Sequence, residues 1–100
     1  RARAYRILDA MLPISARWRG MLNDARLAGH PAPVDFTRVR VPTLIVSAED
    51  DRFGTAATAR AMARRIGSAE LLMFPSGGHV FLGHDAEAAA AVAGFVKRHR

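Results

Sequence analysis

The hydrophobic pattern in the first third of the chain has the period of an α-helix. Apolar residues recur every three or four positions, which predicts helices over Ala2–Leu12 and about Ile14–Ala28, with a proline between them. A stretch rich in glycine and proline then follows and interrupts the pattern. We therefore expect a helical segment over residues 1–36 and a separate unit over residues 37–100.

The pattern of the second unit alternates between strands and helices. A continuous apolar run rich in β-branched residues predicts a strand over Thr43–Ala48 that is buried on both faces. A helix over about Thr55–Ile66, a strand over about Glu70–Phe74 and a helix over Ala86–His99 are predicted to follow, and Asp85 can cap the last helix. The side chains expected to point inward are Ala59, Met62, Ala63 and Ile66 on the first of these helices and Ala89, Val92, Phe95 and Val96 on the second. A strand–helix–strand order implies parallel strands joined by a right-handed crossover. The predicted fold class is therefore α/β.

Two strands make an incomplete sheet. Leu44, Ile45 and Val46 each gain roughly 1.5–3 kcal/mol on full burial, and two helices cannot cover both faces and both edges of the pair. We therefore expect another polypeptide to cover the sheet edge. It would be either a missing N-terminal half, so that the chain is a fragment, or a second chain.

The charge, the cysteine content and the length of the apolar runs argue against several classes of function. The net charge of +6 comes almost wholly from arginine, but the arginines are scattered and have no interleaved aromatic residues, so we expect no nucleic-acid partner. The chain has no cysteine, which excludes disulfides and thiolate metal sites. No apolar run reaches the about 18 residues of a membrane span, and no secretory signal opens the chain, so we expect a cytoplasmic protein.

Two residues with catalytic chemistry follow the two predicted strands. Asp51 comes shortly after the first strand, and His79 follows the second strand behind Gly77-Gly78. The carboxyl ends of parallel strands form the ligand-binding edge of such sheets, so we expect both side chains at that edge. An aspartate there can fix the tautomer of a histidine, which can then transfer protons. Asp50 is interpreted as a turn residue, as is common after a strand.

The remaining candidates for chemistry are the histidines, as metal ligands, and the serines, as nucleophiles. His84 follows His79 closely, but a zinc site needs three or four convergent ligands, so we predict no metal and no cofactor. No Gly-x-Ser-x-Gly motif occurs, and none of the serines is flanked as a nucleophile: Ser15, Ser47, Ser68 and Ser76. The acid and the base are therefore present without a nucleophile.

The two strand-end motifs together resemble a known family. Val41-Pro42-Thr43-Leu44-Ile45-Val46 followed by Asp51, and then Gly77-Gly78-His79, are similar to the last two strands of the α/β-hydrolase fold. The resemblance covers Val39 to about Arg98 and implies the C-terminal portion of an α/β-hydrolase. It also implies that Asp51 is the acid and His79 the base of a catalytic triad. One departure is Ala48, where the family commonly has glycine.

The resemblance also implies an activity for the complete protein. That activity is hydrolysis of a small-molecule ester or a related acyl or C–C bond, and the helical segment over residues 1–36 resembles the end of a cap inserted before this point. Without a nucleophile, this chain alone is expected to be inactive. The alternative hypothesis is a non-catalytic interaction or regulatory module that retains the C-terminal half of the fold.

Overall fold

The computed structural model describes all of residues 1–100, and its contacts divide them into two units, Arg1–Val34 and Asp35–Arg100. The first unit consists of α1 (Ala2–Met11) and α2 (Ile14–Gly29). Both expected helices are therefore present, with C-terminal ends one residue from the predicted positions. None of the helices in either unit is both long and apolar enough to cross a bilayer.

Neither α1 nor α2 buries a side chain. Tyr5 and Leu8 of α1 are 59% and 54% exposed, and Trp18 and Leu22 of α2 are 48% and 60% exposed. The sequence pattern correctly predicts that these segments are helical. Their apolar stripes nevertheless remain in contact with solvent, because two short helices alone cannot enclose a core.

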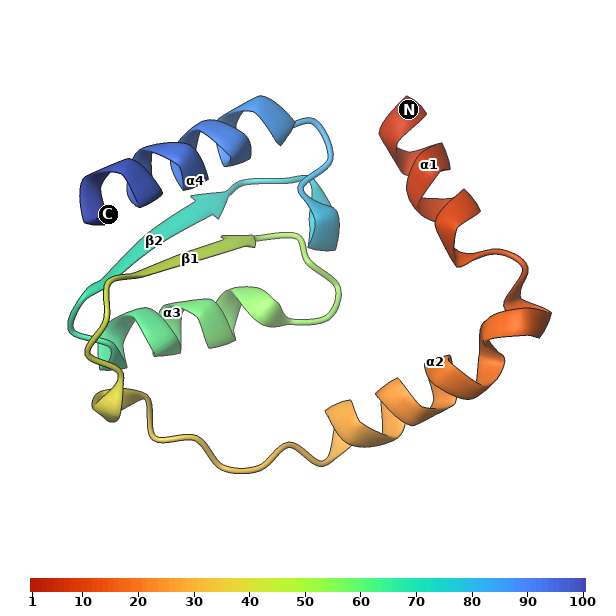
Figure 1. The fold of residues 1–100 in the computed structure, drawn as a ribbon, viewed down its shortest axis with the longest axis horizontal. Coiled ribbons are helices and arrows are strands. Elements are labelled where there is room, and N and C mark those ends of the chain that lie inside the picture. The colour runs from red at the N-terminus through yellow and green to blue at the C-terminus, as the bar shows by residue number, and fades with distance from the viewer. The chain divides into compact units, whose positions relative to one another are not determined.

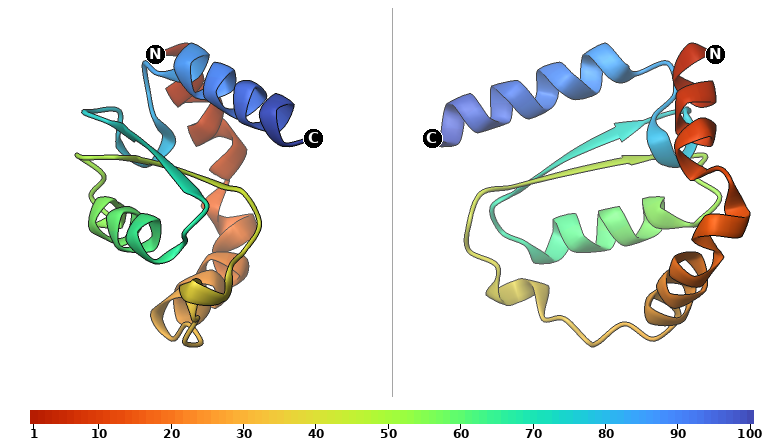
Figure 2. Two further views of the ribbon diagram at one scale, coloured as in Figure 1. Left: turned by 90° about the vertical axis from the view of Figure 1, so that its left-hand side faces the viewer. Right: turned by 45° about the vertical axis from the view of Figure 1, so that its right-hand side comes forward.

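The second unit is an α/β structure. It contains β1 (Thr43–Ala48), α3 (Thr55–Arg65), β2 (Ala69–Phe74) and α4 (Asp85–His99), with 3-10 turns at Phe36–Arg38 and Gly78–Val80. The strands are parallel, and their register runs from Thr43 opposite Ala69 to Ala48 opposite Phe74. The two helices lie on opposite sides of the strand pair (Figures 1 and 2). This arrangement confirms the predicted fold class.

Small side chains allow α3 to pack closely on the strands. Ala59 is buried, Met62 and Ala63 are half-buried, and Ile66 beyond the last turn is 3% exposed, which agrees with the inner face predicted from the sequence. Ala56 is buried as well. Ile66 is already extended, with φ −89° and ψ 107°, and its N–H donates to the Met62 carbonyl. The helix therefore ends without needing the conformational freedom of Gly67.

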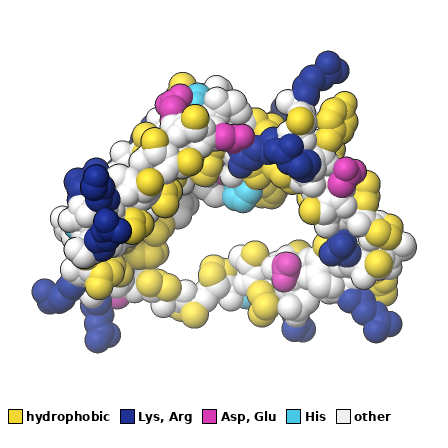
Figure 3. All heavy atoms as spheres, turned by 45° about the horizontal axis from the view of Figure 1, so that its top comes forward, with side chains coloured by type: hydrophobic (Ala, Val, Ile, Leu, Met, Phe, Trp, Pro, Cys, Tyr) yellow, Lys and Arg dark blue, Asp and Glu magenta, His cyan; other side chains and the backbone are white.

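The α4 helix is less well packed than its apolar sequence suggests. Ala88, Ala91 and Phe95 are half-buried, whereas Val92 and Val96 are 49% and 52% exposed. The expectation that both valines point inward was wrong, because a run of alanines leaves the helix with no periodic signal that selects one face. Hydrophobic side chains accordingly appear on the surface among the charged ones (Figure 3).

The best-packed part of the core lies at the carboxyl end of the strand pair. Ala48 is fully buried, and Phe74 is the largest fully buried side chain. The Phe74 ring stacks on His84 at a centroid distance of 4.4 Å and lies 5.6 Å from the ring of Phe81. Because these contacts hold the segment after β2 against the core, they position the loop that carries His79.

Candidate active site

Asp51 and His79 meet at the carboxyl ends of the two strands. His79 Nδ1 lies 2.9 Å from Asp51 Oδ2, as the positions of both residues after parallel strands predict. The side chain of Asp51 is 2% exposed, whereas that of His79 is 59% exposed. The carboxylate is thus fixed inside the protein, while the imidazole can be reached from outside.

The Asp51 carboxylate accepts hydrogen bonds on both of its oxygens. Oδ1 accepts from the Phe53 N–H at 2.9 Å, and Oδ2 accepts from the Thr55 hydroxyl as well as pairing with His79. The bond from Thr55, followed by that from His79, lowers the pKa of Asp51 to about 2, against the opposing effect of burial. Because an ionised carboxylate can only accept a hydrogen bond, the proton between the two residues is on His79 Nδ1, which donates to Asp51 Oδ2. Nε2 is then left to accept a proton.

Asp50 holds the backbone of the same loop. Its Oδ1 accepts from the Gly78 N–H at 2.9 Å, and its Oδ2 accepts from the Gly77 N–H at 3.3 Å. Gly77 has φ +110°, and a Cβ there would lie 2.9 Å from the Leu82 carbonyl oxygen. The interpretation of Asp50 as a turn residue was therefore incomplete. A signal for its second role was available in the sequence, since two adjacent glycines leave their N–H groups open to an acceptor.

Comparison with known proteins identifies the family to which the chain belongs. The profile of a family described as serine hydrolase matches residues 2–90, which is most of the chain. The chain belongs to the serine hydrolase family. No curated protein and no solved structure matches it. Family membership indicates a hydrolase and directs attention to the serines.

No serine of this family member forms a hydrogen bond with His79. Ser47 is 4% exposed on β1, and its Oγ lies 3.2 Å from Thr55 Oγ1. The Ser68 hydroxyl donates to the Val41 carbonyl at 2.5 Å. The hydroxyls of both serines are therefore engaged by groups other than His79.

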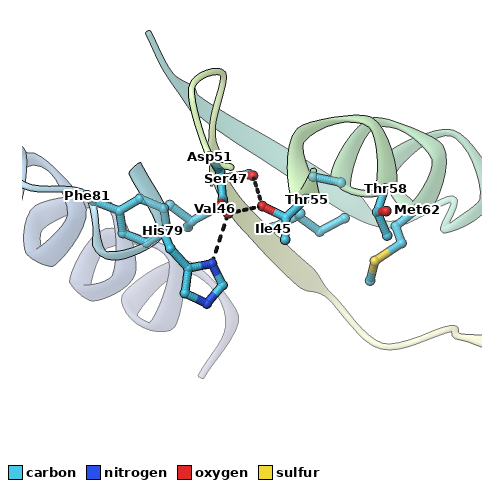
Figure 4. A pocket seen from close by; sticks show the side chains of 10 residues that line it. Ile45, Val46, Ser47, Asp51, Thr55, Thr58, Met62, His79 and Phe81 are labelled. Carbon is cyan, nitrogen blue, oxygen red and sulfur yellow. Dashed lines mark hydrogen bonds and ion pairs between the residues drawn. The ribbon is translucent and has the colours of Figure 1, made fainter. Parts of the chain in front are cut away.

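Two cavities open beside His79. One has a volume of about 280 Å³ and lies between β1 and α3, with Met62 and Phe81 in its wall (Figure 4). The other has a volume of about 400 Å³ and is lined by Phe53 and Leu82 among others. Phe53 is 79% exposed and meets the His79 ring edge-on at a centroid distance of 4.8 Å. The imidazole therefore borders two cavities, each with apolar side chains in its wall.

His84 lies apart from this pair. Its ring stacks on Phe74, and its Nδ1 lies 3.3 Å from Glu87 Oε1. His84 occupies the N-cap position of α4, so the expectation that Asp85 caps this helix was wrong by one residue. No three His, Asp or Glu side chains of residues 1–100 are placed to hold a metal ion together.

Proposed function

We propose that this chain supplies the acid and the base of an α/β-hydrolase catalytic triad. In this proposal His79 is the base, Asp51 is its carboxylate partner, and the nucleophile comes from a polypeptide segment outside these 100 residues. The observation that carries the proposal is the 2.9 Å contact between an exposed imidazole and a buried, ionised carboxylate. Helices α1 and α2 belong to a cap in the same proposal.

The chemistry follows from the protonation states at this pair. His79 Nε2 takes the proton of the nucleophile's hydroxyl as that oxygen attacks the carbonyl carbon of an ester. Asp51 stabilises the imidazolium, which then gives the proton to the departing alcohol and leaves an acyl-enzyme. His79 next takes a proton from water as the water oxygen attacks the acyl carbon. The imidazolium then returns this proton to the nucleophile's oxygen, whose bond to the acyl carbon breaks and releases the acid. A small-molecule ester is therefore the proposed substrate.

The unpaired edge of β1 is the proposed entry point for the rest of the sheet. The sheet has two strands, so β1 has a neighbour on one side only. The 280 Å³ cavity is lined by β1 and α3 but by no residue of β2, and it extends to Asp51 and His79. A strand from the remainder of the protein or from another chain would cover half-buried Val46 and end near the acid and base.

Covalent labelling with a fluorophosphonate, which reacts with activated serine hydroxyls, tests this function in the natural protein that contains these residues. We expect the label on a serine outside residues 1–100. We also expect labelling to slow by about a thousandfold in His79→Ala, because the triad acts as a unit. His30→Ala is the matched control, since His30 is an exposed residue of the other unit.

Two results of the labelling would overturn the proposal in different ways. A label on Ser15, Ser47, Ser68 or Ser76 would show that the nucleophile lies within the chain. A folded protein that takes up no label would favour the alternative, a non-catalytic interaction module that retains this part of the fold.

A further inference from the structure

A chain of three side chains leads from Ser47, near the carboxyl end of β1, to His79. Ser47 on β1 contacts Thr55, the first residue of α3, at 3.2 Å between the hydroxyl oxygens. The Thr55 hydroxyl bonds to Asp51 Oδ2, which is the same oxygen that pairs with His79 (Figure 4). The sequence pattern identified Thr55 only as the start of a helix, so this contact is a product of the tertiary structure.

The direction of each bond in this chain follows from counting protons. Asp51 is ionised and can only accept, so the single hydroxyl proton of Thr55 is directed to it. The Thr55 oxygen then has only lone pairs left for Ser47, and Ser47 must be the donor of that contact. Ser47 therefore orients the Thr55 hydroxyl, and the Thr55 hydroxyl in turn restrains the carboxylate.

The bond to Asp51 is not a by-product of helix capping. The N-cap of α3 is Gly54, and no side chain caps this helix end. Thr58 lies about one turn later on α3 and lines the same cavity, yet its hydroxyl makes no bond to Asp51. A threonine on this part of α3 that lines the 280 Å³ cavity therefore does not bond to Asp51 for that reason alone, and Thr58 is a matched control for Thr55.

We propose that Thr55, oriented by Ser47, is a positioning residue that keeps the Asp51 carboxylate ionised and directed at His79. The proposal rests on the proposed function, because the importance of Asp51 depends on the role of His79 as a base. Among the groups that shift the pKa of Asp51, His79 is the only one that can carry charge. Removal of the Thr55 hydroxyl therefore leaves no second cation to compensate for the lost bond.

The pKa of Asp51 gives a direct test in the protein with ¹³C-labelled aspartate, where Asp51→Asn assigns the carboxyl signal. Thr55→Val keeps the shape of the side chain and removes its donor. We expect the pKa of Asp51 to rise by about one unit, because the hydrogen bond from Thr55 favours the ionised carboxylate and is the largest cause of the low pKa. Thr55→Ser should restore the low value, Ser47→Ala should give a smaller rise, and Thr58→Val should leave the value unchanged.

A second measurement separates this inference from the proposed function. We expect Thr55→Val to slow fluorophosphonate labelling about tenfold, with Thr55→Ser close to the wild-type rate. If the wild type takes up label but Asp51 titrates identically in Thr55→Val, the positioning role is wrong and the hydrolase function stands. If the Asp51 pKa rises as expected but the wild type takes up no label, the function is wrong and the hydrogen-bond assignment stands. Thr55→Ala replaces Thr55→Val if the valine variant does not fold.

Discussion

Asp50 and Asp51 are consecutive residues whose carboxylates bind different parts of the same loop. Asp50 accepts from the N–H groups of Gly77 and Gly78, and Asp51 pairs with the ring of His79. A single turn after β1 thus fixes both the backbone of the loop and the orientation of its imidazole. Since each carboxylate has its own target, the two contributions can be separated by substitution.

Substitution of Asp50 is expected to loosen the loop without removing the contact between Asp51 and His79. In Asp50→Ala the N–H groups of Gly77 and Gly78 lose a charged acceptor, so the free energy of local opening should fall by about 1 kcal/mol. Amide hydrogen exchange at the two glycines should then be about fivefold faster. Asp50→Asn keeps one acceptor oxygen and should show a smaller effect. Unchanged exchange in both variants would contradict the assigned role of Asp50.

Replacement of Gly77 is expected to be costly for two reasons. Its φ of +110° is strained for any residue with a Cβ, and that Cβ would lie 2.9 Å from the Leu82 carbonyl oxygen. Gly77→Ala should therefore lower the free energy of unfolding by about 1–3 kcal/mol, measured from the midpoint of urea denaturation. Gly67→Ala is the control, because no atom within 4 Å would meet its Cβ and its φ is not positive. Equal midpoints for the two variants would rule out the strain argument.

The low pKa of Asp51 predicts the direction of one pH effect on stability. Its pKa in the folded state is about 2, below the value of 3.8 for the free side chain, so the ionised form is the one that folding favours. This contribution is complete above the unfolded-state pKa of about 4, and it is lost as the pH falls toward about 2. Thermal melting should show a smaller loss of Tm over this range for Asp51→Asn than for the wild type. If the Tm of both proteins fell equally with pH, the hydrogen bonds assigned to Asp51 would be contradicted.

The two phenylalanines near the site should differ sharply in their effect on stability. Phe74 is 2% exposed, and Phe74→Ala should lower the free energy of unfolding by about 3–5 kcal/mol, through lost burial and the cavity left behind. Phe53 is 79% exposed and has only its ring contact with His79 to lose, so Phe53→Ala should lower the free energy of unfolding by less than about 1 kcal/mol. Chemical denaturation of the two variants checks both values, and a similar loss in each would contradict the assigned position of the core.

The chain by itself is expected to show no esterase turnover. His79 and Asp51 have no activated serine to deprotonate, since no serine of residues 1–100 bonds to His79. Hydrolysis of p-nitrophenyl acetate by the chain should not exceed that by an equal concentration of free imidazole. Faster release that His79→Ala abolishes would place a working nucleophile inside the chain.

Local sequence patterns determined the secondary structure and the proximity of the acid and the base. The apolar, β-branched run Thr43–Ala48 predicted a buried strand, and its bounds agree with those of β1. Asp51 and His79 follow parallel strands, and parallel strands present their carboxyl ends at one edge. Both inferences depend on chain direction and residue spacing, which are properties of the sequence. The catalytic roles of the two residues stay a prediction.

Only the tertiary structure decided which other groups complete the site and which helix face is buried. Asp50 reaches Gly78 from 28 positions away, and the bond between Thr55 and Asp51 depends on the angle at which α3 leaves the turn after β1. Val92 was expected inside and is exposed, because an alanine-rich helix buries nearly equal area on several faces. Hydrogen bonds need atoms placed within a few tenths of an ångström. Periodicity specifies the type of an element but leaves such placement to the packing of the whole unit.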